Sequence, residues 1–323
     1  MEFEPRIDLQ ELSQTVAAIK GEIEKIVIGQ PQMIELLLTA ILADGHVLIE
    51  GAPGVAKTLT AKLLAKTIDV DFSRIQFTPD LMPSDVLGTS VFNPKNAEFE
   101  FKRGPIFSNI VLVDEINRSP AKTQAALFEV MEERQVTIDG TTYAMPPPFV
   151  VLATQNPIEH EGTYRLPEAQ LDRFLFKIVV QYPSASEEVE ILRGHHLRQS
   201  LTAAIESVRA VLSAAQLSVL RQRARLVHIE DNLMDYIAQI VVQTRNNKAL
   251  FLGASPRASV AILNASKALA AIRGRDFVVP EDIQELAAPV MRHRIVLTPE
   301  REMEGATPDD VVAQILQKID VPR

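Results

Sequence analysis

The sequence contains no cysteine, which excludes disulfide bonds and metal sites built on thiolates. It also lacks a long apolar run, since the longest, residues 36–43, falls far short of the roughly 20 residues that a membrane-spanning helix needs. The N-terminus is acidic and has no basic segment followed by an apolar stretch, which argues against a secretory signal. We therefore expect a cytoplasmic protein without membrane insertion.

Basic side chains are in the minority. The 33 Lys and Arg residues are outnumbered by 42 Asp and Glu residues, which gives a net charge of −9. Because non-specific nucleic-acid binding needs a basic surface, this balance argues against a nucleic-acid partner, although a local basic loop could still line a channel. The length of 323 residues and the apolar fraction of 46% fit two modest globular domains.

Helix and strand patterns alternate up to about residue 182, and an almost purely helical pattern follows. The strands expected in the first part cover residues 46–49, 74–77, 109–113, 149–153 and 176–180. Short apolar strands separated by helices predict a parallel sheet covered on both faces, in a three-layer α/β/α core. We place this core at residues 1–182 and an all-α domain at residues 183–323.

Two segments interrupt this alternation. Residues 91–101 and 136–144 each contain two short β-prone stretches separated by turn residues. In the second segment the turn is Asp139-Gly140, a strong hairpin signal. We expect two β-hairpins inserted into the core, either as surface decoration or with a function of their own.

A glycine-rich loop joins the first expected strand to the helix that follows it, which is the context of a phosphate-binding loop. Backbone N–H groups of small residues and the helix N-terminus would surround the β-phosphate. Lys57 can reach the β- and γ-phosphate oxygens, and the Thr58 hydroxyl can bind Mg²⁺. The predicted ligand is ATP with Mg²⁺. The predicted phosphate-binding residues are Gly51, Ala52, Pro53, Gly54, Val55, Ala56, Lys57, Thr58 and Leu59.

One position departs from the general phosphate-loop pattern, because Ala56 stands where glycine usually precedes the lysine. A methyl group is compatible with that position if the backbone is already helical, since glycine is required only at positive φ or at very close approach. We therefore expect helical backbone at Ala56. A degenerate loop that binds nothing is the alternative.

Two acids end the strand expected at residues 109–113. Because ligands bind at the carboxyl ends of parallel strands, Asp114 and Glu115 should lie beside the phosphate loop. Asp114 is the candidate Mg²⁺ ligand, and Glu115 is the candidate group that orients or deprotonates the attacking water. Asn156, after the next strand, could position the same water, or it could simply form a turn with Pro157.

Together these elements resemble the AAA+ ATPases. Four sequence motifs are similar to those of the MoxR branch, at residues 51–58, 114–118, 153–157 and 166–174. The resemblance includes alanine at position 56. The two hairpins fall where that branch, the magnesium chelatase ATPase subunit and the MCM helicases carry a helix-2 insert and a pre-sensor-1 hairpin. The resemblance covers about residues 25–295.

The resemblance also assigns single residues. Ile28 and Gly29 fall in the segment that packs near adenine, and Asn156 falls at the sensor-1 position. Arg173 falls at the arginine finger, with Arg165 as a weaker competitor, and Arg257 falls at the sensor-2 arginine of a helical lid. The alternative for Arg173 and Arg257 is that each forms only a surface salt bridge.

The implied protein is a ring ATPase, expected to be a hexamer in which the finger comes from the neighbouring subunit and Arg257 contacts the γ-phosphate of its own chain. Its implied role is that of an ATP-driven chaperone for a partner with a von Willebrand factor A domain. The alternatives are a chelatase-type motor subunit, a nucleic-acid translocase and a nucleotide-binding switch that hardly turns over.

Overall fold

The computed structural model describes residues 7–156, 164, 166–197 and 200–322. Its centre is a sheet of five parallel strands in the order β2-β5-β8-β1-β9. The strands are β1 (His46–Gly51), β2 (Phe72–Gln76), β5 (Ile110–Asp114), β8 (Val150–Gln155) and β9 (Phe174–Val180). Each lies within a few residues of a strand expected from the sequence, so the predicted parallel sheet is confirmed.

Alternating side chains of these strands bury against opposite layers. In β1, Val47 and Ile49 join one apolar cluster, whereas Leu48 joins a second one. In β5, Leu112 and Val113 divide in the same way. This period of two, with apolar residues on both faces, is why the strands read as continuous apolar runs.

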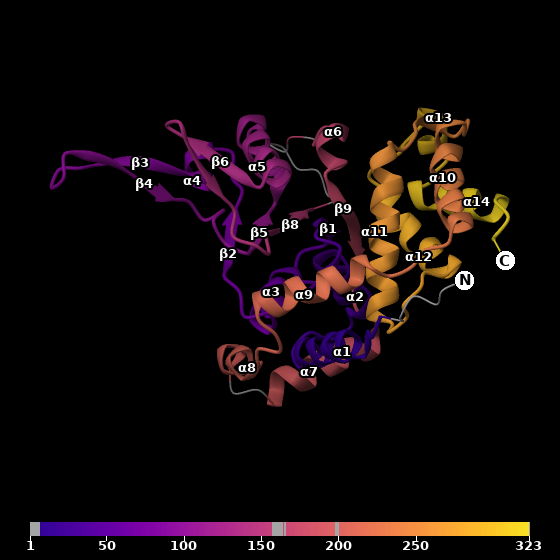
Figure 1. Ribbon diagram of the computed structural model, residues 1–323, viewed down its shortest axis with the longest axis horizontal. Helices are drawn as coiled ribbons and strands as arrows, with labels where there is room; N and C mark the ends of the chain where they lie inside the picture. Colours follow the sequence, from indigo (N-terminus) through magenta and orange to yellow (C-terminus); the bar gives the residue numbers. More distant parts are fainter. Residues whose placement is uncertain (1–6, 157–163, 165, 198–199, 323) are drawn as a thin grey trace.

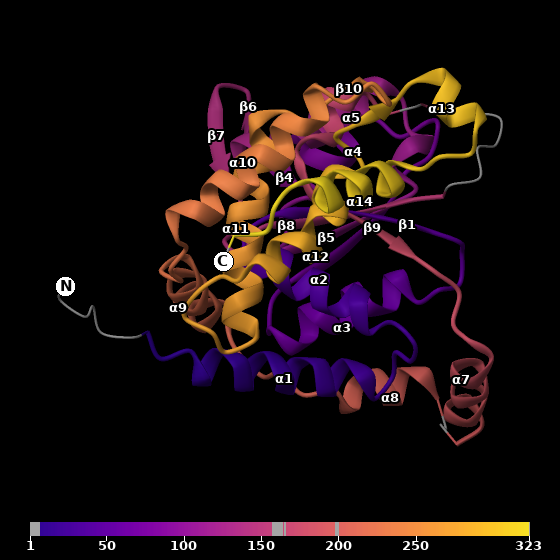
Figure 2. The same ribbon diagram turned by 90° about the vertical axis from the view of Figure 1, so that its right-hand side faces the viewer.

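Helices α2 (Pro31–Leu42) and α3 (Lys57–Thr67) cover the first face of the sheet, and α1 (Gln10–Glu24) packs outside them (Figures 1 and 2). Pro31 occupies the first turn of α2, where its missing N–H costs no hydrogen bond. The second face carries α4 (Pro83–Leu87), the 3₁₀ turn η1 (Ile116–Arg118) and α5 (Ala121–Glu133). The core is therefore three-layered, as predicted.

Both expected hairpins are present, as β3 (Gly88–Asn93) with β4 (Glu98–Arg103) and β6 (Gln135–Ile138) with β7 (Thr141–Ala144). The first projects from the body of the molecule (Figure 1). In the second, Asp139 and Gly140 have φ values of 49° and 78°, the left-handed conformation that this turn requires. The hairpins contact each other through Ser90, which donates a hydrogen bond to Asp139.

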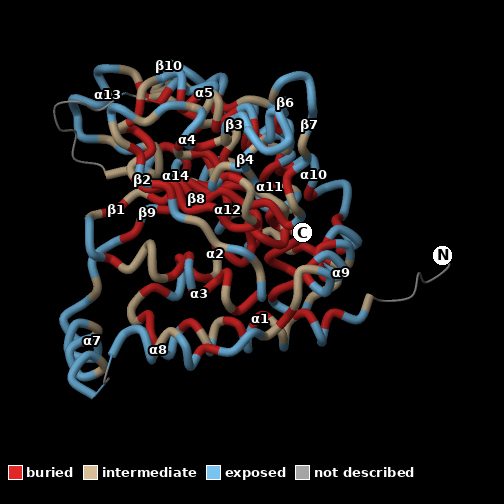
Figure 3. The backbone as a smooth tube through the Cα atoms, turned by 90° about the vertical axis from the view of Figure 1, so that its left-hand side faces the viewer, coloured by how far each residue is buried: buried red, intermediate tan, exposed pale blue. Residues whose placement is uncertain are grey.

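The C-terminal part is helical, as predicted. Its helices after α6 (Glu168–Leu171) are α7 (Ala185–Leu197), α8 (Leu201–Ser207), α9 (Ala214–Arg225), α10 (Asp231–Arg245), α11 (Pro256–Ile272), α12 (Pro280–Met291), α13 (Pro299–Met303) and α14 (Pro308–Lys318). Figure 3 shows α7 mostly exposed, whereas α2, α3, α11 and α12 contain long buried stretches. Two short strands, β10 (Leu250–Leu252) and β11 (Val296–Leu297), pair within this part.

The pairing of β10 with β11 was not predicted, because strands of three and two residues carry no readable period. Helix α11 packs against α2, and α12 packs against β9, so one apolar cluster continues from the sheet into the C-terminal helices. The boundary at residues 182 and 183 stays a prediction. Among the described residues, no helix combines the length and the apolar character needed to cross a membrane.

Candidate active site

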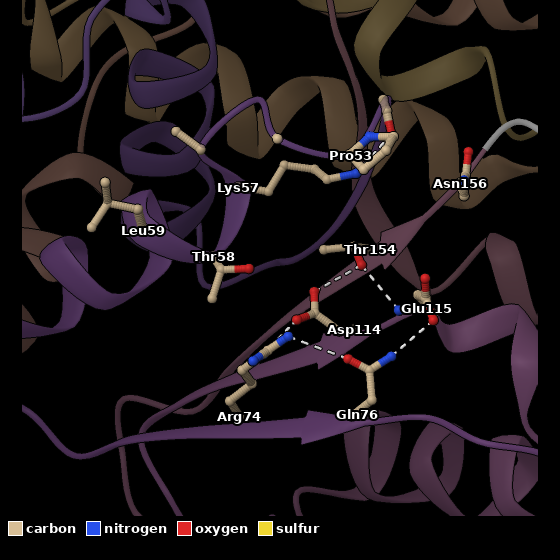
Figure 4. A pocket seen from close by; sticks show the side chains of 13 residues that line it. Pro53, Lys57, Thr58, Leu59, Arg74, Gln76, Asp114, Glu115, Thr154 and Asn156 are labelled. Atoms are coloured by element: carbon tan, nitrogen blue, oxygen red, sulfur yellow. Dashed lines mark hydrogen bonds and ion pairs between the residues drawn. The ribbon is translucent and has the colours of Figure 1, made fainter. Parts of the chain in front are cut away.

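A cavity of about 370 Å³ lies at the carboxyl ends of the parallel strands (Figure 4). It brings together the glycine-rich loop, Asp114 at the end of β5, Glu115 directly after it, and Asn156 after β8, as the sequence predicts. The residues lining it are Gly51, Pro53, Gly54, Ala56, Lys57, Thr58, Leu59, Arg74, Gln76, Asp114, Glu115, Thr154 and Asn156. Ala52 and Val55 belong to the same loop, and Val55 is buried.

The backbone at Ala56 differs from the prediction. Its φ of 62° and ψ of 18° are left-handed, not helical, so this position does favour glycine. A non-glycine residue there carries strain of about 1–2 kcal/mol. Gly54, with φ of 85°, meets no atom within 4 Å of a Cβ built on it, so its glycine is explained by conformation. The loop thus combines one relaxed and one strained left-handed residue.

Lys57 begins α3 and extends along the inside of the loop, where its Nζ donates a hydrogen bond to the Gly51 carbonyl at 2.7 Å. Partial burial lowers the pKa of Lys57, and the nearby charges of Asp114, Glu115 and Glu50 oppose that shift. The ammonium group is therefore incompletely solvated and lies within the electrostatic influence of three carboxylates. Such a group is suited to bind the oxygens of a polyphosphate.

Asp114 is nearly buried, at 7% exposed, and both of its carboxylate oxygens have partners. Oδ1 accepts a hydrogen bond from the Thr154 hydroxyl at 3.0 Å, and Oδ2 pairs with Arg74 Nε at 2.6 Å. Thr58 lines the same cavity. A hydroxyl and a carboxylate are hard oxygen ligands of the kind that Mg²⁺ prefers, so this pair fits the predicted metal.

Glu115 has a left-handed backbone with φ of 56°, an uncommon conformation for a residue with a side chain. Its backbone N–H donates to Thr154 Oγ1 at 3.0 Å. Its carboxylate accepts a hydrogen bond from Gln76 Nε2 at 2.9 Å and lies 3.1 Å from Arg118 Nε. Backbone and side chain are both held, so the carboxylate has a defined position in the cavity.

Three residues that line the cavity were not predicted from the sequence, namely Arg74, Gln76 and Thr154. Arg74 and Gln76 alternate on β2, and the register places Gln76 beside Asp114. Polar residues at alternate positions near the carboxyl end of a strand could have indicated a functional face. Thr154, on β8, pairs with Ile49 of the neighbouring strand β1. Its hydroxyl links Asp114 to the backbone of Glu115.

The segment expected to pack near adenine lies at another cavity, of about 610 Å³. Gly29 contributes to its wall, together with Gln30, Tyr182 and Arg292, whereas Ile28 is half-buried and does not line it. Gly29 has φ of 77°, which explains the glycine at that position. The expected roles of Ile28 and Gly29 stay predictions.

Arg173 and Arg257 do not line the phosphate cavity. Both instead pair with Glu132 on α5, at 3.7 Å for Arg173 Nε and 3.0 Å for Arg257 Nη2. We call Glu132, Arg173 and Arg257 the arginine cluster. The expected roles of Arg173 and Arg257 stay predictions. The competing finger candidate, Arg165, lies outside the described residues.

A metal site of another kind is not indicated. No group of three or more His, Cys, Asp or Glu side chains with metal-binding geometry occurs in the described part of the chain. His195 and His196 are adjacent and exposed on α7.

Comparisons with known proteins agree with this geometry. Residues 46–176 match the model of the ATPase family associated with various cellular activities (AAA), and residues 242–315 match the AAA lid domain. The chain is 46% identical to the chaperone MoxR1 of Mycobacterium tuberculosis over 94% of its length and 81% of that protein. The chain belongs to the MoxR family of AAA+ ATPases.

Two further similar proteins extend over nearly the whole chain. YeaC of Bacillus subtilis is 47% identical over 93% of this chain and 92% of that protein. A crystal structure from Cytophaga hutchinsonii, of a protein regarded as an ATPase, has a TM-score of 0.90 and 42% identity, with 98% of this chain and 97% of that chain covered. The α/β core with its helical lid is therefore an architecture that the chain shares with the Cytophaga hutchinsonii structure.

Proposed function

We propose that this MoxR-family protein hydrolyses ATP in the presence of Mg²⁺ and uses the cycle, as a chaperone, to remodel partner proteins. The observation that carries the proposal is the cavity in which Lys57, Asp114, Glu115 and Asn156 meet. Phosphoryl transfer needs few covalent steps from the protein, so positioned charges of this kind supply most of the catalysis.

The roles follow from the contacts. Lys57 binds the β- and γ-phosphate oxygens, and Thr58 with Asp114 would hold Mg²⁺, which neutralises phosphate charge when bound. Glu115 accepts the proton of the attacking water while Gln76 and Arg118 fix its carboxylate. Asn156 orients the same water from the end of β8.

The protein would act as an oligomer, by our proposal a hexameric ring. Arg173 and Arg257 lie outside the phosphate cavity of their own chain, which supports their delivery to the cavity of a neighbouring subunit. A head-to-tail interface of this kind closes into a ring when its rotation permits. The similarity to the chaperone MoxR1 of Mycobacterium tuberculosis supports a chaperone role. The partner that we propose is a protein with a von Willebrand factor A domain.

The test separates binding from hydrolysis. Wild-type protein should release phosphate from ATP only with Mg²⁺ present. Lys57→Ala should bind ATP weakly, whereas Glu115→Gln should bind ATP normally and hydrolyse it at least about 100-fold more slowly. Glu133→Gln, an exposed acid at the end of α5, is the control and should match wild type. Normal hydrolysis by Glu115→Gln would remove the proposed mechanism.

A further inference from the structure

Glu132 lies in the last turn of α5 and contacts arginines from two parts of the chain. Its Oε1 accepts a hydrogen bond from Arg257 Nη2 at 3.0 Å, and its Oε2 lies 3.7 Å from Arg173 Nε. Arg173 also donates a hydrogen bond to the Phe128 carbonyl, one turn earlier on α5. The C-terminal end of a helix carries partial negative charge, so both contacts favour a cation at this place.

A second set of contacts fixes the residues beside the two arginines. Asp172 accepts a hydrogen bond from the Ser255 hydroxyl at 2.9 Å, and Ser255 is the N-cap of α11, two residues before Arg257. Arg294, which is 7% exposed, pairs with Asp172 at 2.7 Å. The hydrogen bond between Ser255 and Asp172 therefore connects the segment before Arg257 to the segment before Arg173.

Charge explains why a carboxylate is needed here. The positive charge of Arg257 lies near enough to Arg294 to help lower the pKa of Arg294, after the larger effect of burial. Three guanidinium groups thus meet at one junction, with Asp172 neutralising Arg294 and Glu132 lying between Arg173 and Arg257. Without Glu132, repulsion between like charges would separate the side chains of Arg173 and Arg257.

We propose that Glu132 is a positioning residue, which holds Arg173 and Arg257 as a pair for the active site of a neighbouring subunit. This inference rests on the proposed function, because it requires ATP hydrolysis at a site shared between subunits. Glu132 does not line the phosphate cavity of its own chain. A substitution of Glu132 should therefore slow hydrolysis only when it is present in the subunit that donates the arginines. The same substitution in the subunit that binds the ATP should have no effect on that site.

The alternative is that Glu132 forms only an ordinary surface salt bridge, in which case Glu132→Ala should keep the wild-type kcat. Glu132 is 40% exposed and Arg257 54% exposed, so water screens their pair and its contribution to folding is small. Glu132→Ala should consequently fold with an unchanged melting temperature. If Glu132 positions the arginines, kcat for ATP should fall about tenfold while KM stays near the wild-type value. Glu132→Gln keeps an acceptor for Arg257 and should recover part of kcat.

Subunit mixing assigns the effect to one side of the interface. When Glu132→Ala is mixed in equal amounts with Glu115→Gln, some interfaces combine an intact Glu115 with an intact arginine cluster. Random assembly should then raise activity about fivefold above the average of the two unmixed proteins. Mixing Glu132→Ala with Arg173→Ala creates no such interface and should give no increase.

Each result decides the proposal. The reverse pattern, an increase only with Arg173→Ala, would place Glu132 in the site of its own subunit and overturn it. Wild-type or higher kcat in Glu132→Ala would overturn it as well.

A mixture of Arg173→Ala with Glu115→Gln serves as the reference. Failure of that mixture to gain activity would contradict the shared site of the proposed function, whatever Glu132 does. Glu133→Ala is the matched control on the same helix and should behave as wild type.

Discussion

The phosphate cavity and the arginine cluster are two charged regions of one chain that are held in different ways. The cavity is built at the ends of buried strands, where Asp114 is nearly enclosed and linked to Glu115 through Thr154. The arginine cluster is partly exposed and depends on the junction between α5 and the lid. The hydrolytic groups are therefore fixed by the sheet, whereas the arginines are held by partly exposed ion pairs between side chains of distant segments.

The largest expected effect concerns the cluster. Arg173→Ala should lower kcat about 1000-fold, because an arginine finger stabilises charge that develops only in the transition state. ATP binding should stay near wild type, since Arg173 does not line the phosphate cavity. The measurement is steady-state phosphate release beside equilibrium ATP binding.

The matched control for Arg173→Ala is Arg209→Ala, which removes an arginine that is 81% exposed and pairs with Glu22. It should hydrolyse ATP as wild type does. If Arg173→Ala instead weakens ATP binding and leaves kcat unchanged, the division between cavity and cluster is wrong.

An intermediate effect concerns His46, which links β8 to the end of α5. Its Nδ1 accepts a hydrogen bond from the Val151 N–H at 2.9 Å, and its Nε2 lies 3.1 Å from the Met131 carbonyl on α5, beside Glu132. Burial lowers the pKa of His46 from 6.5 to about 4, and the charge of Arg134 adds to the shift. The neutral ring is thus required by the folded state.

The folded protein should lose stability as the pH falls, because of the lowered pKa of His46. Between pH 6.5 and about 4 the unfolded chain binds a proton at His46 that the folded chain does not. The stability that His46 contributes is therefore complete above pH 6.5 and is lost as the pH falls toward 4, by about 3 kcal/mol in total. Urea unfolding at about pH 7 and about pH 4.5 measures the loss. His46→Gln, which cannot titrate, should lose less, and an equal loss would exclude His46 as its source.

The smallest expected effect lies in the phosphate loop itself. Ala56→Gly should raise the free energy of unfolding by roughly 1 kcal/mol, because glycine adopts the left-handed conformation without strain. Ala203→Gly is the control of opposite sign, since Ala203 lies on α8 and glycine there should destabilise by roughly 1 kcal/mol. Equal destabilisation by both substitutions would show that Ala56 is unstrained.

Much of the fold could be predicted from the sequence, because the apolar strands, the two hairpin turns and the glycine-rich loop are local signals. The acids of the site could be predicted too, since Asp114 and Glu115 directly follow a strand. What could not be predicted depends on contacts between distant residues. Arg74 reaches Asp114 across 40 positions, and Glu132 reaches Arg257 across 125.

The error at Ala56 has a related cause. The sequence showed which residue stood before Lys57 but not its backbone conformation, and alanine is rare at positive φ. Likewise, the position of Arg257 in a motif predicted its type of role but not the direction in which its side chain points. That direction is set by Glu132, a residue to which no motif drew attention.

Mixing two inactive variants shows whether each hydrolytic site is assembled from two subunits. Arg173→Ala and Glu115→Gln should each be nearly inactive alone. An equimolar mixture should recover roughly a quarter of wild-type activity, because a quarter of randomly formed interfaces join an intact Glu115 to an intact Arg173. A mixture that stays inactive, from proteins that still associate, would contradict the shared site.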